Sequence, residues 1–270
     1  MSKTRLAGSW VLITGASSGF GAAAARGFGA EGARLLLGAR RLERLQQVAA
    51  EARKAGAAEA LLHALDVSRT PSVEAFMAWA GQHVRQGNAA DSYLSVLINN
   101  AGGAHGLDPV AQGKDEDWET MLQTNVLGVL RTTRAALPLM LGHEGGTIIN
   151  IGSYAARSVY EGGAAYCAAK AGELQITRTL RLELNGTGIR VSSIDPGLAE
   201  TEFSLVRFKG DAARARKTYE GTHPLTAEDI AEILVWVASR PAHVNIDEML
   251  IKPVDQAAMH KVYRRAGAGR

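Results

Sequence analysis

The stretch Trp10-Val-Leu-Ile-Thr-Gly-Ala-Ser-Ser-Gly-Phe-Gly21 joins a short apolar run to a turn that contains three glycines. Its first five residues read as a buried strand, and the alanine-rich residues 20–31 read as a helix. Gly15, Gly19 and Gly21 permit positive φ angles and a close approach of the backbone to a ligand. The N-terminus of the helix would offer free N–H groups and partial positive charge to a pyrophosphate. The stretch therefore predicts a strand, a phosphate-binding turn and a helix.

The same alternation of apolar runs and helical patterns continues along the chain. The further strands are predicted at 33–39, 60–65, 94–98, 147–151, 189–194 and 248–251, and the further helices at 42–54, 72–84, 118–141, 164–184 and 229–238. Strands that alternate with helices imply right-handed crossovers and a parallel sheet covered by helices on both faces. We therefore expect one doubly wound α/β domain over residues 1–270. Ligands bind such sheets beyond the carboxyl ends of the strands, where residues 100–114, 152–163 and 196–225 are expected to be irregular.

The composition excludes several classes of protein. Of the 270 residues 46% are hydrophobic, the formal net charge is +3, and Cys167 is the single cysteine. A lone cysteine excludes an intramolecular disulfide and is typical of a reducing compartment. No stretch approaches the ~18 consecutive apolar residues of a membrane span, and no His/Cys spacing predicts a metal site. We expect a soluble cytoplasmic protein without a membrane or nucleic-acid partner, and a flexible tail over residues 261–270.

Tyr166 and Lys170 carry the strongest prediction of chemistry. They are four residues apart, so a helix places them on one face. A phenol has an ordinary pKa of about 10 and is a poor base at neutral pH, but a lysine ammonium one turn away favours the phenolate. Such a phenol can give or take a proton, as general acid–base catalysis requires. Together with the glycine turn, the pair predicts a nicotinamide-dependent oxidoreductase, with Ser153 donating a hydrogen bond to the substrate oxygen.

The end of the second predicted strand selects between the two nicotinamide cofactors. An acidic residue there would hold the free ribose 2′-OH of NAD, whereas arginine suits the 2′-phosphate of NADP. The chain has Arg40 and Arg41 at this point, and the first acid, Glu43, comes later on the following helix. Arginine offers forked donors to a phosphate and a flat surface to an adenine, so we predict NADP. Two solvated arginines at a helix start are the alternative.

Other polar residues follow strand ends or helix starts. Asp66-Val67 follows the third strand, where the carboxylate could accept a bond from the adenine amino group or could cap a helix. Asn99-Asn-Ala-Gly102 follows the fourth strand and suits a ribose or a nicotinamide riboside. Asp115-Glu-Asp117 could be carboxylates for acid–base work, but acids at a helix start are more simply explained by the helix dipole. His105 is predicted to be solvated, or else to line the mouth of the pocket.

On these residues the chain resembles the short-chain dehydrogenase/reductase family. The resemblance spans almost the whole chain and rests on Thr14-Gly-x-x-x-Gly-x-Gly21, Asn99-Asn-Ala-Gly102, Asn125, Ser153, Tyr166-x-x-x-Lys170 and Asp195-Pro-Gly197. It implies a Rossmann-type domain with a seven-stranded parallel sheet, a homotetramer, and a catalytic set of Asn125, Ser153, Tyr166 and Lys170. In this family the lysine also holds the nicotinamide ribose, and the asparagine fixes a water that links the lysine to bulk solvent. The implied NADP contacts are Gly15, Ser17, Ser18, Gly19, Phe20, Gly21, Arg40, Arg41, Asp66, Val67, Asn100, Ala101, Gly102, Tyr166, Lys170, Pro196, Gly197 and Thr201.

A narrower resemblance is to the NADP-dependent 3-hydroxy acid (serine/L-allo-threonine) dehydrogenases. It rests on stretches that include Asp117-Trp-Glu-Thr-Met121, Thr201-Glu-Phe-Ser204 and Val206-Arg-Phe-Lys-Gly-Asp211. By contrast, the loop from Gly197 to Thr201 looks one residue shorter than in that subgroup, and residues 251–257 look more like a wider set of NADP-dependent reductases. The resemblance implies oxidation of a 3-hydroxy acid or a 2-amino-3-hydroxy acid. The alternatives are a broad ketone or aldehyde reductase and a non-catalytic NADP-binding scaffold.

A hydroxy acid carries a carboxylate, so its pocket is expected to contain a cation. Residues 198–220 are predicted to form a mobile substrate lid, and they include Arg207 and Lys209. Arg207 is the first candidate because a guanidinium fork fits a carboxylate. Lys209 and Arg157 are further candidates, and solvated lid charges are the alternative.

Overall fold

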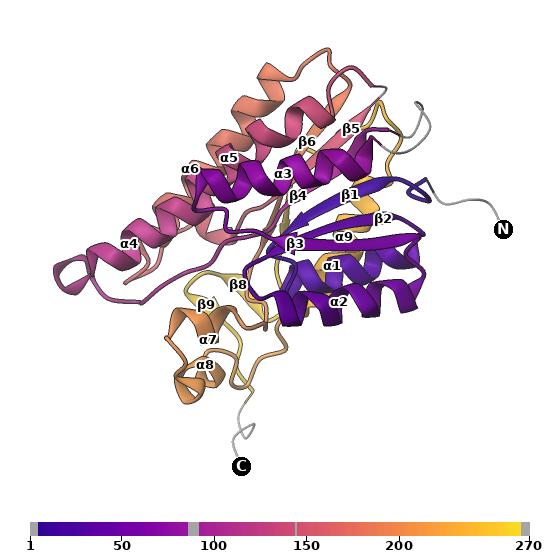
Figure 1. The fold of residues 1–270 in the computed structure, drawn as a ribbon. Coiled ribbons are helices and arrows are strands. Elements are labelled where there is room, and N and C mark those ends of the chain that lie inside the picture. The colour runs from indigo at the N-terminus through magenta and orange to yellow at the C-terminus, as the bar shows by residue number, and fades with distance from the viewer. Residues whose placement is uncertain (1–4, 86–91, 144, 266–270) are drawn as a thin grey trace.

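The computed structural model describes residues 5–85, 92–143 and 145–265, and its centre is a seven-stranded sheet (Figure 1). Its order is β3-β2-β1-β4-β5-β6-β7, and every pair of neighbouring strands is parallel. The strand order reverses between β1 and β4, where sheets of this kind bind ligands. The doubly wound α/β prediction is confirmed. The strands are β1 Trp10–Thr14, β2 Arg34–Ala39, β3 Glu59–Ala64, β4 Leu94–Asn99, β5 Gly146–Ile151, β6 Ile189–Pro196 and β7 Glu248–Ile251.

Helices cover both faces of this sheet. Figure 1 shows α1, α2 and α9 on one side of it and α3, α5 and α6 on the other. The helices among the described residues are α1 Gly19–Ala30, α2 Leu42–Ala55, α3 Thr70–Val84, α4 Asp115–Leu122, α5 Gly128–Ala136, α6 Ala164–Glu183, α7 Phe203–Arg207, α8 Ala212–Lys217 and α9 Ala227–Ala238.

The two apolar cores follow from the alternation of side chains along the strands. In β1, Val11 and Ile13 belong to the core that contains Phe28 of α1, whereas Leu12 belongs to the core that contains Phe76 of α3. All five side chains are fully buried. Because both faces of each central strand are covered, the strands are continuous apolar runs, and this is why their positions could be predicted from the sequence.

The helix predicted at 118–141 is present, but it is not a regular α-helix throughout. It begins at Asp115, so three acidic residues lie in its first turn, and a π-helical turn, Gln123–Leu127, separates α4 from α5. Within that turn the side-chain amide of Asn125 donates to the carbonyl oxygen of Met121 at 2.8 Å. A regular α-helix would direct the backbone N–H of the same residue to that oxygen. The interruption therefore coincides with a residue predicted to be catalytic, as π-turns often do.

The predicted lid is more regular than expected, because it contains α7 and α8. A hairpin of β8 Gln256–Ala258 and β9 Lys261–Val262 was not predicted. Figure 1 shows α7, α8 and the hairpin gathered at one side of the molecule, apart from the helices that cover the sheet. In the predicted tail, the N–H of Arg265 donates to the carbonyl oxygen of Gly221 at 2.7 Å. Residues 266–270 of that tail lie outside the described residues.

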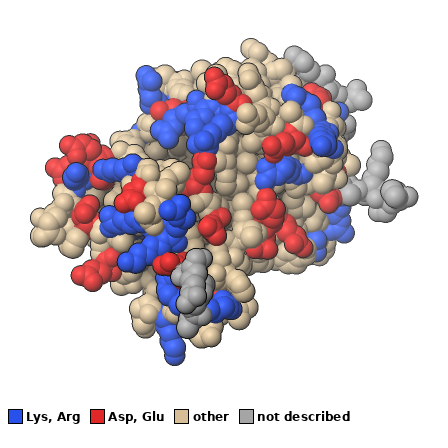
Figure 2. Space-filling model, turned by 90° about the horizontal axis from the view of Figure 1, so that it is seen from below, with Lys and Arg blue, Asp and Glu red and all other residues tan. Residues whose placement is uncertain are grey.

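Charged side chains of both signs are interspersed on the face that Figure 2 presents. Charged side chains also form ion pairs between helices: Arg26 of α1 pairs with Glu51 of α2 and with Glu228 of α9, both at 2.9 Å. In the part of the chain that the structure describes, no helix is both long enough and apolar enough to cross a membrane.

Candidate active site

The glycine turn after β1 depends on glycine for two different reasons. Gly15 and Gly19 have φ angles of 66° and 52°, which residues other than glycine rarely adopt. A Cβ on Gly21 would lie 2.5 Å from Nδ2 of Asn100, so this position needs a residue without a side chain. Asn100 Nδ2 also donates to the carbonyl oxygen of Thr14 at 2.9 Å. The turns after β1 and β4 are thus held against each other where the strand order reverses.

These turns open on a cleft of about 700 Å³. The cleft extends from the glycine turn past β4, β5 and β6 to the lid, and it brings together almost every residue predicted to bind cofactor or substrate. The exceptions are Gly21 in the first turn of α1, Asn125 in the π-turn, and the two further candidate cations Lys209 and Arg157. The predicted residues that line it are Gly15, Ser17, Ser18, Gly19, Phe20, Arg40, Arg41, Asp66, Val67, Asn100, Ala101, Gly102, Ser153, Tyr166, Lys170, Pro196, Gly197, Thr201 and Arg207.

The cleft also has a wall that the sequence did not predict. This wall contains Gln256, Met259 and Val262, which belong to the β8–β9 hairpin or its turn. Gln256 Oε1 accepts the N–H of Leu198 at 2.7 Å and therefore fixes the chain just after Gly197. No local pattern points to these residues, because their position depends on a hairpin far along the chain.

Tyr166, Lys170 and Ser153 meet where α6 passes the end of β5. Tyr166 is buried with 8% of its surface exposed, and its ring packs edge-on against Phe203 of α7 with centroids 5.6 Å apart. Lys170 Nζ donates to the carbonyl oxygen of Ile151 at 2.8 Å. Ser153 Oγ accepts the N–H of Ala155 at 3.1 Å, which leaves its hydroxyl proton available to a substrate oxygen.

Glu173 is a buried acid that sequence reasoning missed. Its carboxylate lies 2.7 Å from Lys170 Nζ, and its side chain is 2% exposed. Burial raises the pKa of Glu173 to about 7, against the opposing effect of the Lys170 charge. Burial alone would lower the pKa of Lys170, but the charges of Glu173 and Tyr166 outweigh it and raise that pKa. The spacing of three residues on one helix was the signal that could have identified Glu173.

Asn125 is buried and makes all its described hydrogen bonds within the protein. Its Oδ1 accepts the N–H of Gly103 at 3.1 Å, and its Nδ2 donates to the carbonyl oxygen of Gly103 at 2.9 Å. A Cβ on Gly102 would lie 2.5 Å from this Oδ1 and 3.7 Å from Lys170 Nζ. Asn125 therefore fixes the loop after β4 beside the lysine, and its water-binding role stays a prediction.

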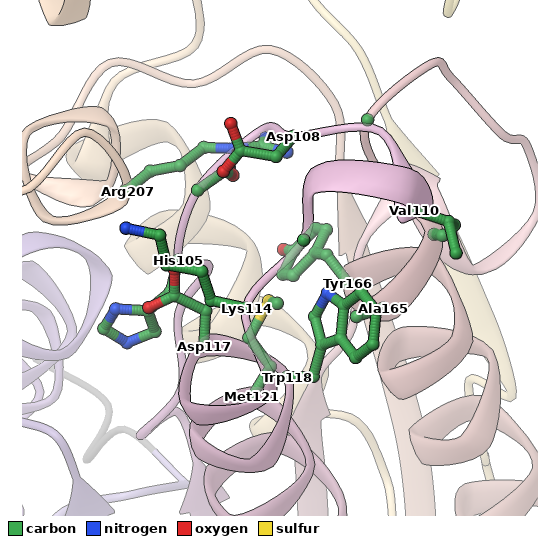
Figure 3. Close-up of a pocket in the computed structure, with 14 residues that line it drawn as sticks. His105, Asp108, Val110, Lys114, Asp117, Trp118, Met121, Ala165, Tyr166 and Arg207 are labelled. Carbon is green, nitrogen blue, oxygen red and sulfur yellow. Dashed lines mark hydrogen bonds between the residues drawn. The ribbon is translucent and has the colours of Figure 1, made fainter.

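Arg207 reaches from the lid into the site, where it lines a small side pocket with Tyr166 (Figure 3). Its Nε donates to the carbonyl oxygen of Gly106 at 3.0 Å, and its Nη2 donates to Tyr160 Oη at 2.9 Å. Its guanidinium carbon lies 5.8 Å from the centre of the Tyr166 ring. Burial raises the pKa of Tyr160 to about 12 despite Arg207, so this phenol stays a neutral partner. Among the described residues, no carboxylate pairs with Arg207.

The other two candidate cations are already paired with acids. Lys209 Nζ lies 2.8 Å from Asp117 Oδ2. Asp117, in the first turn of α4, therefore forms an ion pair in addition to its favourable interaction with the helix dipole. Arg157 Nη2 lies 2.6 Å from Asp195 Oδ2 and also pairs with Glu248. Neither cation lines the 700 Å³ cleft. Of the three predicted candidates, Arg207 is therefore the one that lines this cleft.

At the opposite end of the cleft, Arg41 joins the glycine turn to the lid. Its Nη2 donates to Ser18 Oγ at 2.6 Å, and its Nη1 lies 2.9 Å from Glu202 Oε2. Arg40 is exposed and lines the cleft. Asp66 also lines it, but its Oδ1 accepts the N–H of Ser68 at 3.0 Å within a turn. The helix cap considered for Asp66 was wrong, because the cap position of α3 is Arg69, whereas the adenine contact stays a prediction.

Comparison with known proteins gives a consistent family relationship. The short chain dehydrogenase family profile matches residues 9–210. The NADP-dependent 3-hydroxy acid dehydrogenase YdfG of Salmonella typhi is 46% identical over 248 residues, which cover 92% of this chain and 96% of that protein. A serine 3-dehydrogenase of Agrobacterium fabrum is 40% identical over 259 residues, covering 95% and 98%. A closed form of serine dehydrogenase complexed with NADP⁺ superposes with a TM-score of 0.84 at 41% identity, covering 95% of this chain and 99% of that one.

Proposed function

The chain belongs to the short-chain dehydrogenase family, and from that premise we propose that it is an NADP-dependent dehydrogenase of 3-hydroxy acids or 2-amino-3-hydroxy acids. The observation that carries the choice of substrate is the position of Arg207, a cation without an acidic partner among the described residues, 5.8 Å from the centre of the Tyr166 ring. A carboxylate bound by this guanidinium would hold a neighbouring hydroxyl beside the phenol. The names of the relatives support this choice, because they state NADP as the cofactor and a 3-hydroxy acid or serine as the substrate.

The residues of the cleft fit NADP. Gly15 and Gly21 let the turn pack against the loop after β4, and Gly19 and Phe20 at the start of α1 line the cleft, where the helix N-terminus can bind a pyrophosphate. Arg40 and Arg41 lie at the end of the cleft that follows β2, where a 2′-phosphate is expected. Lys170 lies at the other end, where it would hold the nicotinamide ribose. When bound, NADP(H) would accept or supply the hydride.

The protein's own groups would move one proton. In the oxidation, Tyr166 as phenolate removes the proton from the substrate hydroxyl, and in the reduction its phenol protonates the developing alkoxide. Lys170, 8% exposed in its side chain, places its charge one helical turn from this phenol. Ser153 donates its hydroxyl proton to the substrate oxygen and stabilises charge as it forms.

The lid would close the site around the substrate. We propose that residues 198–220 do this as a mobile segment, with Thr201 against Gly19 at one end and Arg207 over Tyr166 further along. Closure would exclude water from the reacting atoms and complete the contact to the substrate carboxylate.

We further propose that the chain assembles as a homotetramer. Leu122, Leu127 and Leu130 of the α4–α5 region are exposed by 45%, 37% and 43%, and Leu182 of α6 is exposed by 79%. Apolar side chains gathered on two neighbouring helices support an interface between copies of the chain. Light scattering coupled to size-exclusion chromatography would test this, and a monomer at micromolar concentration would contradict it.

The test of the substrate assignment is reduction of NADP⁺ by the purified protein with L-serine, L-allo-threonine, 3-hydroxypropionate or 3-hydroxyisobutyrate. Neutral secondary alcohols and an NAD⁺ assay are the controls. We expect Arg207→Ala to raise KM for the acids on the order of 30-fold or more, because the half-buried guanidinium that would pair with the carboxylate is lost. Lys209→Ala, which removes a cation already paired with Asp117, should change KM about twofold at most.

Two outcomes would replace the proposal. An unchanged KM for the acids in Arg207→Ala would remove the cationic pocket. Turnover of neutral alcohols alone would favour the broad ketone or aldehyde reductase, which the apolar cleft residues Phe203, Leu107 and Met259 would suit. Binding of NADP⁺ without turnover of any alcohol would favour the non-catalytic scaffold.

A further inference from the structure

Glu202 lies at the start of the lid, and its carboxylate bridges two arginines at the end of the cleft where the 2′-phosphate is expected. Its Oε2 lies 2.9 Å from Arg41 Nη1, and its Oε1 pairs with Arg44 Nη1. Arg41 in turn donates to the hydroxyls of Ser17 and Ser18 in the glycine turn, at 3.3 Å and 2.6 Å. The carboxylate thus completes a site made of two guanidinium groups and two hydroxyls.

The donors around Glu202 are those that a phosphate monoester prefers. Guanidinium forks bind carboxylate and phosphate in the same geometry, and serine hydroxyls supply further donors. Burial alone would raise the pKa of Glu202, but its bonds to Arg44 and Arg41 outweigh this and lower that pKa. The acid is therefore charged at neutral pH. Two anions cannot share these donors without strong mutual repulsion, so the carboxylate and a ligand phosphate exclude each other.

We propose that Glu202 is an internal competitor for the 2′-phosphate of the cofactor, and that a 2′-phosphorylated adenosine ligand displaces it from Arg41 and Arg44. This inference rests on the proposed use of NADP. It adds Arg44 to the phosphate site, a residue that neither the cofactor prediction nor the strand end indicated. The inference also means that binding of the 2′-phosphate changes the contacts of the residues at the start of the lid.

The displaced carboxylate is connected to the substrate end of the cleft. Phe203, the next residue, begins α7 and packs against the Tyr166 ring. Arg207 ends the same helix and lies over that ring. A ligand that frees Glu202 therefore changes the anchoring of the helix that carries the proposed substrate cation. A ligand without the 2′-phosphate leaves this anchor in place.

The test uses two probes that differ in one phosphate, adenosine 2′,5′-bisphosphate and adenosine 5′-monophosphate, titrated calorimetrically into the full chain. Glu202→Gln should bind the bisphosphate about three- to tenfold more tightly than the wild type, because two partly exposed ion pairs no longer compete. Binding of the monophosphate should stay the same within about twofold. Glu43→Gln is the matched control: it removes the same charge beside Arg44, from a side chain that is exposed and forms no ion pair within the described residues.

A second measurement does not depend on a variant. In hydrogen exchange of the wild type, the bisphosphate should increase exchange of the amides at 202–208 relative to the monophosphate, since it removes one anchor of the lid. Equal or weaker binding of the bisphosphate by Glu202→Gln, or no difference in exchange between the two probes, would overturn the inference. A wild type that binds both probes equally would instead overturn the proposed NADP dependence, and the inference with it.

Discussion

Replacing Glu173 by Gln should remove a pH dependence of stability that the wild type shows near neutrality. The carboxylate is 2% exposed and its pKa is raised from 4.5 to about 7, chiefly by burial, although Lys170 opposes the change. At Glu173, desolvation thus outweighs the attraction of the Lys170 charge. Gln keeps the shape and hydrogen-bonding capacity of the protonated acid but does not titrate.

The size and sign of the effect follow from the folded and unfolded pKa values of Glu173. A folded pKa above the unfolded one means that the folded protein binds the proton more tightly, so the contribution to stability is complete below pH 4.5 and is lost as the pH rises through about 7. A tenfold difference in proton affinity corresponds to about 1.4 kcal/mol, so the wild type should lose about 3 kcal/mol of unfolding free energy over this window. The raised pKa of Lys170 acts only at alkaline pH and leaves the window unaffected.

Urea unfolding of the wild type and Glu173→Gln at several pH values, at one protein concentration, measures the effect as a difference between the two proteins. The difference should change by about 3 kcal/mol between about pH 5 and about pH 8, with the wild type relatively more stable at the acidic end. Glu43→Gln, the same change at an exposed position, should show no such slope. A difference that stays constant over this range would refute the raised pKa of Glu173.

Three further predictions address the chemistry and the architecture. Tyr166→Phe should lower kcat by about 10²–10⁴-fold while NADP⁺ affinity, measured by fluorescence titration, changes little, and retained turnover would contradict the role of the phenol. A Cβ on Gly21 would lie 2.6 Å from the carbonyl oxygen of the first glycine of the turn, so Gly21→Ala should lower the unfolding free energy by about 1–3 kcal/mol and weaken NADP⁺ binding. An unchanged unfolding free energy and NADP⁺ affinity would show that the turn can relax. Arg157→Met leaves the carboxylate of Asp195, 0% exposed, without its ion-pair partner and should lower the unfolding free energy by about 3–5 kcal/mol. Arg178→Met, at a side chain 42% exposed, should lower it by less than about 1 kcal/mol, and equal urea midpoints of the two variants would contradict this contrast.

The sequence predicted the sheet and the cofactor half of the cleft because both depend on local patterns. Residues such as Val11 and Leu12 are buried on opposite faces of one strand, so the strand appears as an unbroken apolar run. Gly15 and Gly21 are required by turn geometry within a few residues of β1. The Tyr166–Lys170 pair is fixed by one helical turn. In each case the determining interaction lies within one element or one turn.

The parts that could not be predicted depend on contacts between distant segments. The interruption of the long helix at Asn125 reflects bonds to Gly103, on the loop after another strand. Gln256 reaches the cleft wall through a hairpin whose two short strands carry no strong pattern. Arg157 was a candidate for the substrate cation because it follows Ser153 closely, but its partner Asp195 lies 38 residues later in the chain. Sequence spacing gives no information on which acid a cation meets in three dimensions.

The charged side chains of the lid differ in the partners that they contact. Glu202, at its start, is held by Arg41, and Lys209, just after α7, is held by Asp117. Arg207 lies between these two ion pairs, bonded to neutral oxygens of Gly106 and Tyr160. The ion pairs place α7 over the cleft, and the guanidinium between them keeps a net positive charge at the phenol of the proposed catalytic pair. A substrate carboxylate would therefore pair with a guanidinium that has no acidic partner among the described residues, whereas a neutral alcohol would leave the half-buried Arg207 without an anion, at a cost in desolvation.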